Sequence, residues 1–251
     1  MTKARTGARI EVDQAAGLIT SKLQALADPR RATSNQRFFK QPIPSLGIDA
    51  PTLRGLTRAW IQRLKRDWSL LQACELCELL LRQPELEVRA AGFLVLGGFS
   101  RVFDDGLWER AEAWLDLRLD NWALVDGFAS AVLSPLLKGH PDGVIHLRRW
   151  IRSECLWTRR GALVTLVPLA RRGEHLDLAF ELSEVVLGEK EDLMHKALGW
   201  LLRETGKGDS KRLRAFLLRH GGDIPRTSVR YAIERFPEEE RKSFLVKTRG
   251  V

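Results

Sequence analysis

The chain has 251 residues, 44% of them apolar and 29% charged, which is enough for one large domain or two small ones with a sizeable core. No apolar run is long enough to span a bilayer, and the basic start MTKARTGARI lacks the apolar segment of a signal peptide, so we expect a cytoplasmic protein. The net charge of +9 favours a polyanionic partner, most often a nucleic acid.

In chain order, residues 1–9 are predicted to form a flexible basic tail, and almost everything after them is predicted to be helical. Apolar residues recur at three- and four-residue spacing, and no alternating β pattern persists. Gly and Pro separate the segments, and 33–51 is predicted to be a Pro-containing loop. The predicted helices are 11–27, 52–66, 69–82, 85–101, 106–117, 120–138, 142–152, 157–172, 176–188, 191–206, 209–219 and 227–246.

Metal or redox chemistry is not expected from the cysteines and histidines. Cys74 and Cys77 form a CxxC, but it lies within a predicted helix and has no second CxxC or His pair nearby. The five histidines form no spacing typical of a ligand set. We therefore predict packed cysteines, no metal site and no cofactor.

One phrase recurs along the helices and indicates a repeat. A charged residue followed by small and apolar residues begins at positions 89, 126, 160 and 196, in steps of 37, 34 and 36. A period of this size with two helices per unit is typical of HEAT-like repeats. The predicted fold class is therefore all-α, an α-solenoid of HEAT-like helical repeats with a concave face, forming a single domain over 10–251.

The leading residues of the phrase are Arg89, Asp126, Arg160 and Lys196, which such a repeat would align on one surface. Trp122 precedes Asp126 by four residues, and Trp200 follows Lys196 by four, so each indole shares a helix face with its charged neighbour. The pattern predicts a basic trough that contains one carboxylate and two indoles, and cations of this kind can follow a phosphate backbone. A carboxylate there would repel phosphates. Either it pairs with Arg160 or Lys196, or it takes part in chemistry.

These segments resemble the AlkD family of HEAT-like DNA glycosylases. Three motifs occur in order, with the forms W-x-x-x-D, W-x-x-R and K-x-x-G-W-x-x-R-E, and the likeness extends over about residues 30–235. The matching segments are FFK at 38–40, LGIDAPTLR at 46–54, NWALVD at 121–126, LWTRRGA at 156–162 and KALGWLLRE at 196–204.

The resemblance implies catalytic roles for three residues. Trp122 and Trp200 would pack against the deoxyribose of the damaged nucleotide, and Asp126 would be the catalytic carboxylate between them. An N3- or N7-alkylated purine already carries positive charge and can leave as a neutral base, so no general acid is needed. A fixed anion would stabilise the oxocarbenium-like sugar, with indole faces adding cation–π attraction, and would position the attacking water.

The resemblance also implies DNA contacts. Arg160 and Arg203 would contact the DNA backbone, with Lys196 and Arg54 as further contacts. Phe38 stands where family members often carry Tyr, so a hydroxyl is missing while stacking remains. The implied partner is double-stranded DNA that contains alkylated purines. The protein would act as a monomer, associate with the nucleoid and not bind a membrane.

The function implied is that of a monofunctional DNA glycosylase that removes bases of the 3-methyladenine and 7-methylguanine type. Two alternatives stay open from the sequence. One is a helical-repeat scaffold that binds DNA or protein and catalyses nothing. The other is a glycosylase specialised for bulky natural-product adducts.

Overall fold

The structure is a computed structural model that describes residues 10–248, so the predicted tail at 1–9 lies outside the described residues. Helices and no β-strand occur over this range. The chain divides into two compact units, one ending at Phe103 and the other beginning at Asp104. Because each repeat contacts mainly its neighbours, a repeat array can contain compact parts, and the prediction of one domain over 10–251 stays a prediction.

The elements of the first unit are α1 (Val12–Gln24), α2 (Pro29–Asn35), η1 (Gln36–Phe38), α3 (Ala50–Leu64), α4 (Leu70–Leu81), α5 (Leu86–Gly97) and η2 (Ser100–Val102). In this unit, α1 packs on α4 and α5, and α3 packs on α5. Helices α4 and α5 approach closely because α5 carries Gly92 at the contact. A Cβ at Gly92 would lie 3.1 Å from the Leu80 Cβ atom and 3.2 Å from the Cys77 carbonyl oxygen. Cys77 is therefore a packing residue of this unit.

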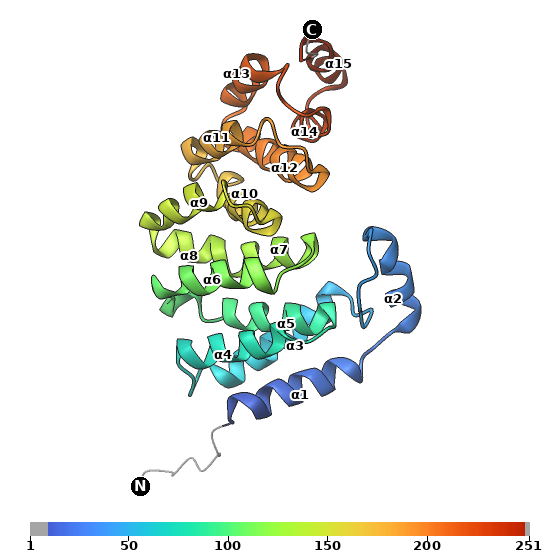
Figure 1. The fold of residues 1–251 in the computed structure, drawn as a ribbon, viewed down its shortest axis with the longest axis vertical. Helices are drawn as coiled ribbons and strands as arrows, with labels where there is room; N and C mark the ends of the chain where they lie inside the picture. Colours follow the sequence, from blue (N-terminus) through green and yellow to red (C-terminus); the bar gives the residue numbers. More distant parts are fainter. Residues whose placement is uncertain (1–9, 249–251) are drawn as a thin grey trace. The chain divides into compact units, whose positions relative to one another are not determined.

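The second unit is a stack of helical layers (Figure 1). Its elements are α6 (Gly106–Leu117), α7 (Trp122–Phe128), η3 (Ala129–Leu133), α8 (Ser134–Gly139), η4 (Pro141–Gly143), α9 (Val144–Trp150), α10 (Leu156–Ala170), α11 (Leu176–Val185), α12 (Asp192–Gly208), α13 (Ser210–His220), α14 (Arg226–Ala232) and α15 (Glu238–Lys247).

Helix α10 is the centre of this unit. Every residue from Arg160 to Ala170 except Pro168 is buried, and α10 packs on α6, α7, α9, α11 and α12. Helix α12 then packs closely on α14, since a Cβ at Gly199 would lie 2.7 Å from the Ser228 carbonyl oxygen. Helices α7, α10, α12 and α14 thus form one continuous row. Packing of this kind confirms the predicted all-α fold of stacked helical repeats.

Proline accounts for the main differences from the predicted helices. Residues 120–138 are not one regular helix, because η3 is a π-helical turn placed just before Pro135, which has no N–H for a normal helix bond. The predicted helix 227–246 ends early, and a new helix begins after Pro237. Part of the predicted loop 33–51 is helical, since Asp28 caps α2 and Pro29 begins it.

Candidate functional site

Asp126 lies on a short helix whose start is fixed by a side-chain cap. The Asn121 side chain accepts a hydrogen bond from the Leu124 N–H at 3.1 Å, so α7 begins at Trp122. Asp126 follows one helical turn later, and both side chains are half-buried on the same face. The π-helical turn η3 comes directly after this helix. The local sequence therefore presents an indole and a carboxylate together.

A bidentate ion pair fixes the Asp126 carboxylate. The Arg160 Nε atom lies 2.8 Å from Oδ1 of Asp126, and Nη2 lies 2.8 Å from Oδ2. Only 17% of the Asp126 side chain and 5% of the Arg160 side chain are exposed. The remaining Nη1 group of Arg160 donates to the carbonyl oxygen of Leu193 at the start of α12. One guanidinium thus connects α7, α10 and α12.

Burial raises the pKa of Asp126, while the hydrogen bonds and positive charge of Arg160 oppose that effect only in part. Each carboxylate oxygen accepts from Arg160 and keeps lone-pair capacity for another group. The site can therefore hold a negative charge in a fixed direction, and proton uptake occurs at higher pH than for an ordinary aspartate.

One face of α12 carries the next predicted residues. Lys196, Trp200 and Arg203 follow each other at helical spacing, and Trp200 is half-buried. Lys196 pairs with Asp192 at 2.8 Å between Nζ and Oδ2. This stripe begins beside Leu193, where Arg160 binds the backbone. The structure therefore connects Asp126 to the α12 stripe through Arg160.

At the far end of that stripe lies a buried carboxylate, Glu204. The sequence does not predict that several cations gather around it. The Glu204 side chain is 0% exposed, and its oxygens contact Arg171 at 2.9 Å, Arg203 at 3.4 Å and Lys207. The outer Nη1 group of Arg203 binds Glu234, which lies just beyond α14. Arg203 is therefore engaged by two carboxylates.

The predicted basic trough needs a correction. Arg89 and Arg160 are both buried, so two of its three leading cations do not lie on the surface. Their depth follows from the apolar phrase that surrounds them, which packs its whole helix turn into the core. The DNA-contact role of Arg160 stays a prediction, but its geometry is that of a partner for Asp126.

Phe38 and Arg54 belong to the first unit. Phe38 is 57% exposed at the end of η1, with the Arg37 guanidinium 4.9 Å from its ring centroid. The Gln36 side chain donates to the Gln41 carbonyl oxygen at 2.8 Å and accepts from the Ile43 N–H at 3.0 Å. These bonds fix the chain around Phe38, so the ring stands on an ordered segment.

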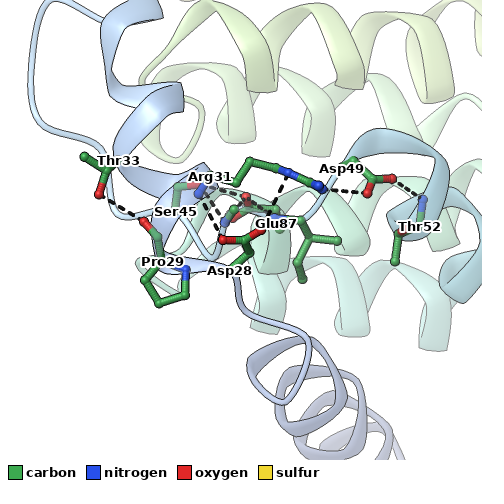
Figure 2. Close-up of polar contacts among 10 residues, drawn as sticks. Asp28, Pro29, Arg31, Thr33, Ser45, Asp49, Thr52 and Glu87 are labelled. Carbon is green, nitrogen blue, oxygen red and sulfur yellow. Dashed lines mark hydrogen bonds and ion pairs between the residues drawn. The ribbon is translucent and has the colours of Figure 1, made fainter.

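The buried carboxylate of Glu87 binds the next part of this segment, residues 45–47 (Figure 2). The sequence does not predict this contact. Glu87 on α5 accepts from the Ser45 hydroxyl at 2.7 Å and from the N–H groups of Leu46 at 2.8 Å and Gly47 at 3.0 Å. Arg31 on α2 donates to Asp49, which caps α3. Glu87 thereby positions the start of α3, which carries Arg54.

Arg54 is one of three exposed cations on a narrow stripe of α3. Arg58 and Lys65 follow it within about 40° of helical arc, and Lys65 is the C-cap residue. None of the three has an ion-pair partner among residues 10–248, and the helix contains no acidic residue. Arg58 and Lys65 were not predicted from the sequence, although their spacing from Arg54 was the available signal.

Cys74 and Cys77 are packing residues of the first unit. Both are buried, and burial raises the pKa of the Cys77 thiol. No group of three or more metal-binding side chains occurs between residues 10 and 248. No helix in that range is long and apolar enough to cross a membrane.

Comparison with known proteins supplies the family. The model of a family described as DNA alkylation repair enzyme matches residues 19–236. A solved structure described as a predicted DNA alkylation repair enzyme from Enterococcus faecalis is similar at 17% identity, with a TM-score of 0.75 over 84% of this chain and 97% of that one. No curated protein matches. The family match covers most of the chain, and the protein therefore belongs to the DNA alkylation repair enzyme family.

Proposed function

We propose that this protein is a monofunctional DNA glycosylase that hydrolyses the N-glycosidic bond of N3- or N7-alkylated purines in duplex DNA. The observation that carries the proposal is the fixed Asp126 carboxylate, which shares a helix face with Trp122 and is oriented by Arg160. Membership of the DNA alkylation repair enzyme family supports it. We further propose action as a monomer, without a cofactor, on DNA bound along a concave face.

The reaction needs little from the protein beyond electrostatics and position. The bond between C1′ of the sugar and the purine nitrogen breaks, and its electron pair neutralises the cationic base. Water then adds to C1′ and gives up a proton. In this proposal Asp126 stabilises the cationic sugar and holds the water, while Trp122 and Trp200 pack against the sugar.

Arg160 acts as a positioning residue for Asp126. A buried carboxylate without a partner would take up a proton at neutral pH. The paired guanidinium favours the ionised form and fixes both oxygens. The Asp126–Arg160 pair is neutral overall. It can still stabilise the cationic sugar, because the Asp126 carboxylate is fixed in orientation and would lie nearer to the sugar than the guanidinium does.

Measurement of 7-methylguanine and 3-methyladenine release from methylated duplex tests the proposal. We expect Asp126→Asn to slow release by about 10²–10³-fold in single turnover. Asp177→Asn is the matched control, since it removes an exposed aspartate on α11 that pairs with Arg212. Equal release by wild type and Asp126→Asn would remove Asp126 from the mechanism, and a borohydride-trapped protein–DNA adduct would contradict monofunctional action.

A second candidate function is a helical-repeat scaffold that binds DNA without catalysis. The observation in its favour is that both Asp126 oxygens are already engaged by Arg160, as in a purely structural ion pair. Salt-sensitive duplex binding without any base release by the wild-type protein would support the scaffold.

A further inference from the structure

Three cations from two helices converge on the single carboxylate of Glu204. Lys207 and the Arg171 Nε atom contact Oε2 of Glu204, and the Arg203 Nε atom lies 3.4 Å from Oε1. Arg171 follows the end of α10, and the other two lie one turn apart on α12. With one buried anion for three cations, the cluster keeps an excess of positive charge.

Glu204 is the residue that holds these cations together. Burial raises its pKa, but hydrogen bonds from Lys207 and Arg171 and their positive charges outweigh burial, so its pKa lies below the usual value. Glu204 therefore stays ionised in neutral solution. Without it the three cations would repel each other and turn apart into solvent.

The outer side of the cluster is closed by an exposed carboxylate. Glu234 is 58% exposed and binds Nη1 of Arg203, which points away from Glu204. Because Glu234 is open to solvent, its pair with Arg203 is weakly held from that side, and another anion can replace Glu234 at small cost. A phosphate with several oxygens matches an arginine and its cationic neighbours better than one mobile side chain does.

We propose that Arg203, Arg171 and Lys207 form a binding subsite for one phosphodiester of the DNA backbone. Glu204 orients its cations from within, and Glu234 occupies the outer position until a phosphate displaces it. The subsite rests on the proposed function, since it needs DNA along α12. Arg203 lies three residues beyond Trp200, or about 4.5 Å along the helix, so the phosphate belongs close to the sugar that Trp200 would contact.

Binding of an undamaged duplex tests the subsite separately from base release. We expect Glu234→Gln to bind about two- to fivefold more tightly than wild type, because it frees Arg203 for phosphate. Arg171→Gln, which removes the most exposed cation of the cluster and leaves Arg203 and Lys207 in place, should bind about two- to fivefold more weakly and reduce the salt slope by about 0.9. Glu240→Gln is the matched control, since it frees Arg214 on α13.

A double mutant separates displacement from simple charge repulsion. In an Arg203→Gln background, Glu234→Gln should have no further effect, because the competition for Arg203 is gone. An equal gain in both backgrounds would mean general repulsion and would overturn the proposal, as would unchanged binding by Glu234→Gln. Glu204→Gln provides an independent test. Although this variant loses a negative charge, it should bind DNA more weakly, because the three cations are no longer held together. Unchanged or tighter binding by the folded variant would contradict the role of Glu204.

The two proposals fail in different ways. Base release by wild type together with unchanged duplex binding by Glu234→Gln would reject the subsite and leave the glycosylase intact. Duplex binding that responds as expected without base release would leave the subsite and reject the glycosylase.

Discussion

At the scale of single residues, Asp126 shows how far sequence reasoning reaches. The apolar residues around it predict burial, and burial predicts a cationic partner, with Arg160 and Lys196 as the two candidates one repeat or two repeats away. The structure selects Arg160, while Lys196 pairs with Asp192 on its own helix. The ion pair alone does not decide between structure and chemistry, because a catalytic carboxylate in this setting needs the same partner.

The pKa of Asp126 leads to a prediction about pH. Burial raises this pKa, and the proposed mechanism needs the ionised form, so base release should fall as pH drops through a value above that of a free aspartate. Single-turnover rates for 7-methylguanine release across pH 4–8 measure this decrease at low pH, after subtraction of release without enzyme. A rate that stays constant down to about pH 4 would contradict the raised pKa or the role of the ionised carboxylate.

For two glutamates, the sequence does not indicate the buried position or the distant partners. Glu87 binds a loop about 40 positions away, and Glu204 collects Arg171 from the preceding repeat. Glu204 ends the K-x-x-G-W-x-x-R-E motif beside Arg203, but neither glutamate has a local pattern that indicates its complete burial or its distant partners. Only the packing of helices shows which carboxylates are buried, and that packing depends on contacts that a spacing rule does not contain.

At the scale of elements, helix α3 has three different faces. Leu53, Thr57 and Leu64 are buried, and Leu56 and Trp60 face an open groove shared with α1. The stripe of Arg54, Arg58 and Lys65 lies on a separate face. Because these three cations have no carboxylate partner in the described part of the chain, the stripe is suited to a polyanion.

The α3 stripe leads to a prediction about DNA binding. Replacement of Arg58 and Lys65 together by Gln should weaken binding of undamaged duplex and lower the slope of log K against log salt by about 0.9 for each phosphate that is no longer neutralised. Arg82→Gln serves as the control, since Arg82 in the same unit pairs with Glu78. An unchanged slope in the double variant would show that the stripe does not bind the DNA backbone.

The segment that leads into α3 depends on one glycine. Gly47 has φ 73°, and a Cβ there would lie 2.2 Å from the Asp28 carbonyl oxygen and 2.6 Å from the Ala32 nitrogen. Gly47→Ala should therefore lower the free energy of unfolding by about 2 kcal/mol or more. Gly55, which is helical and has open space around its Cβ position, provides the comparison.

Urea unfolding followed by tryptophan fluorescence measures both variants. Gly55→Ala should be more stable than wild type by about 0.5–1 kcal/mol, since alanine is the better helix former. If Gly47→Ala were as stable as wild type, this result would contradict the close approach of Gly47 to Asp28 and Ala32.

The helices themselves were largely predictable, and the two largest differences have one cause. The 3.6-residue pattern finds α3, α6, α10 and α12 within a few residues of their observed ends. The same pattern continues through Pro135 and Pro237, because apolar spacing records which side is buried and not whether each backbone N–H has a partner. The π turn after Asp126 and the break before α15 were therefore invisible to it.

At the scale of the whole molecule, the distribution of ion pairs decides which cations are available. In the second unit, arginine–carboxylate pairs connect α6 to α9, α9 to α11, α11 to α13 and α13 to α15. Each pair neutralises a cation that the sequence alone would count toward DNA binding. The net charge of +9 is thus a poor guide to location, and the unpaired cations of α3 are better candidates than these arginines.

The contacts of Arg160 with α7 and α12 have a consequence for thermal inactivation. One guanidinium fastens the carboxylate of α7 to the backbone of α12, and it does so from within the most deeply packed helix of the second unit. The proposed catalytic carboxylate, Asp126, lies on helix α7 and not on a loop, so we expect it to stay in place until its surroundings unfold. Thermal loss of activity should accordingly accompany cooperative melting of the whole unit, without a warm, folded but inactive intermediate.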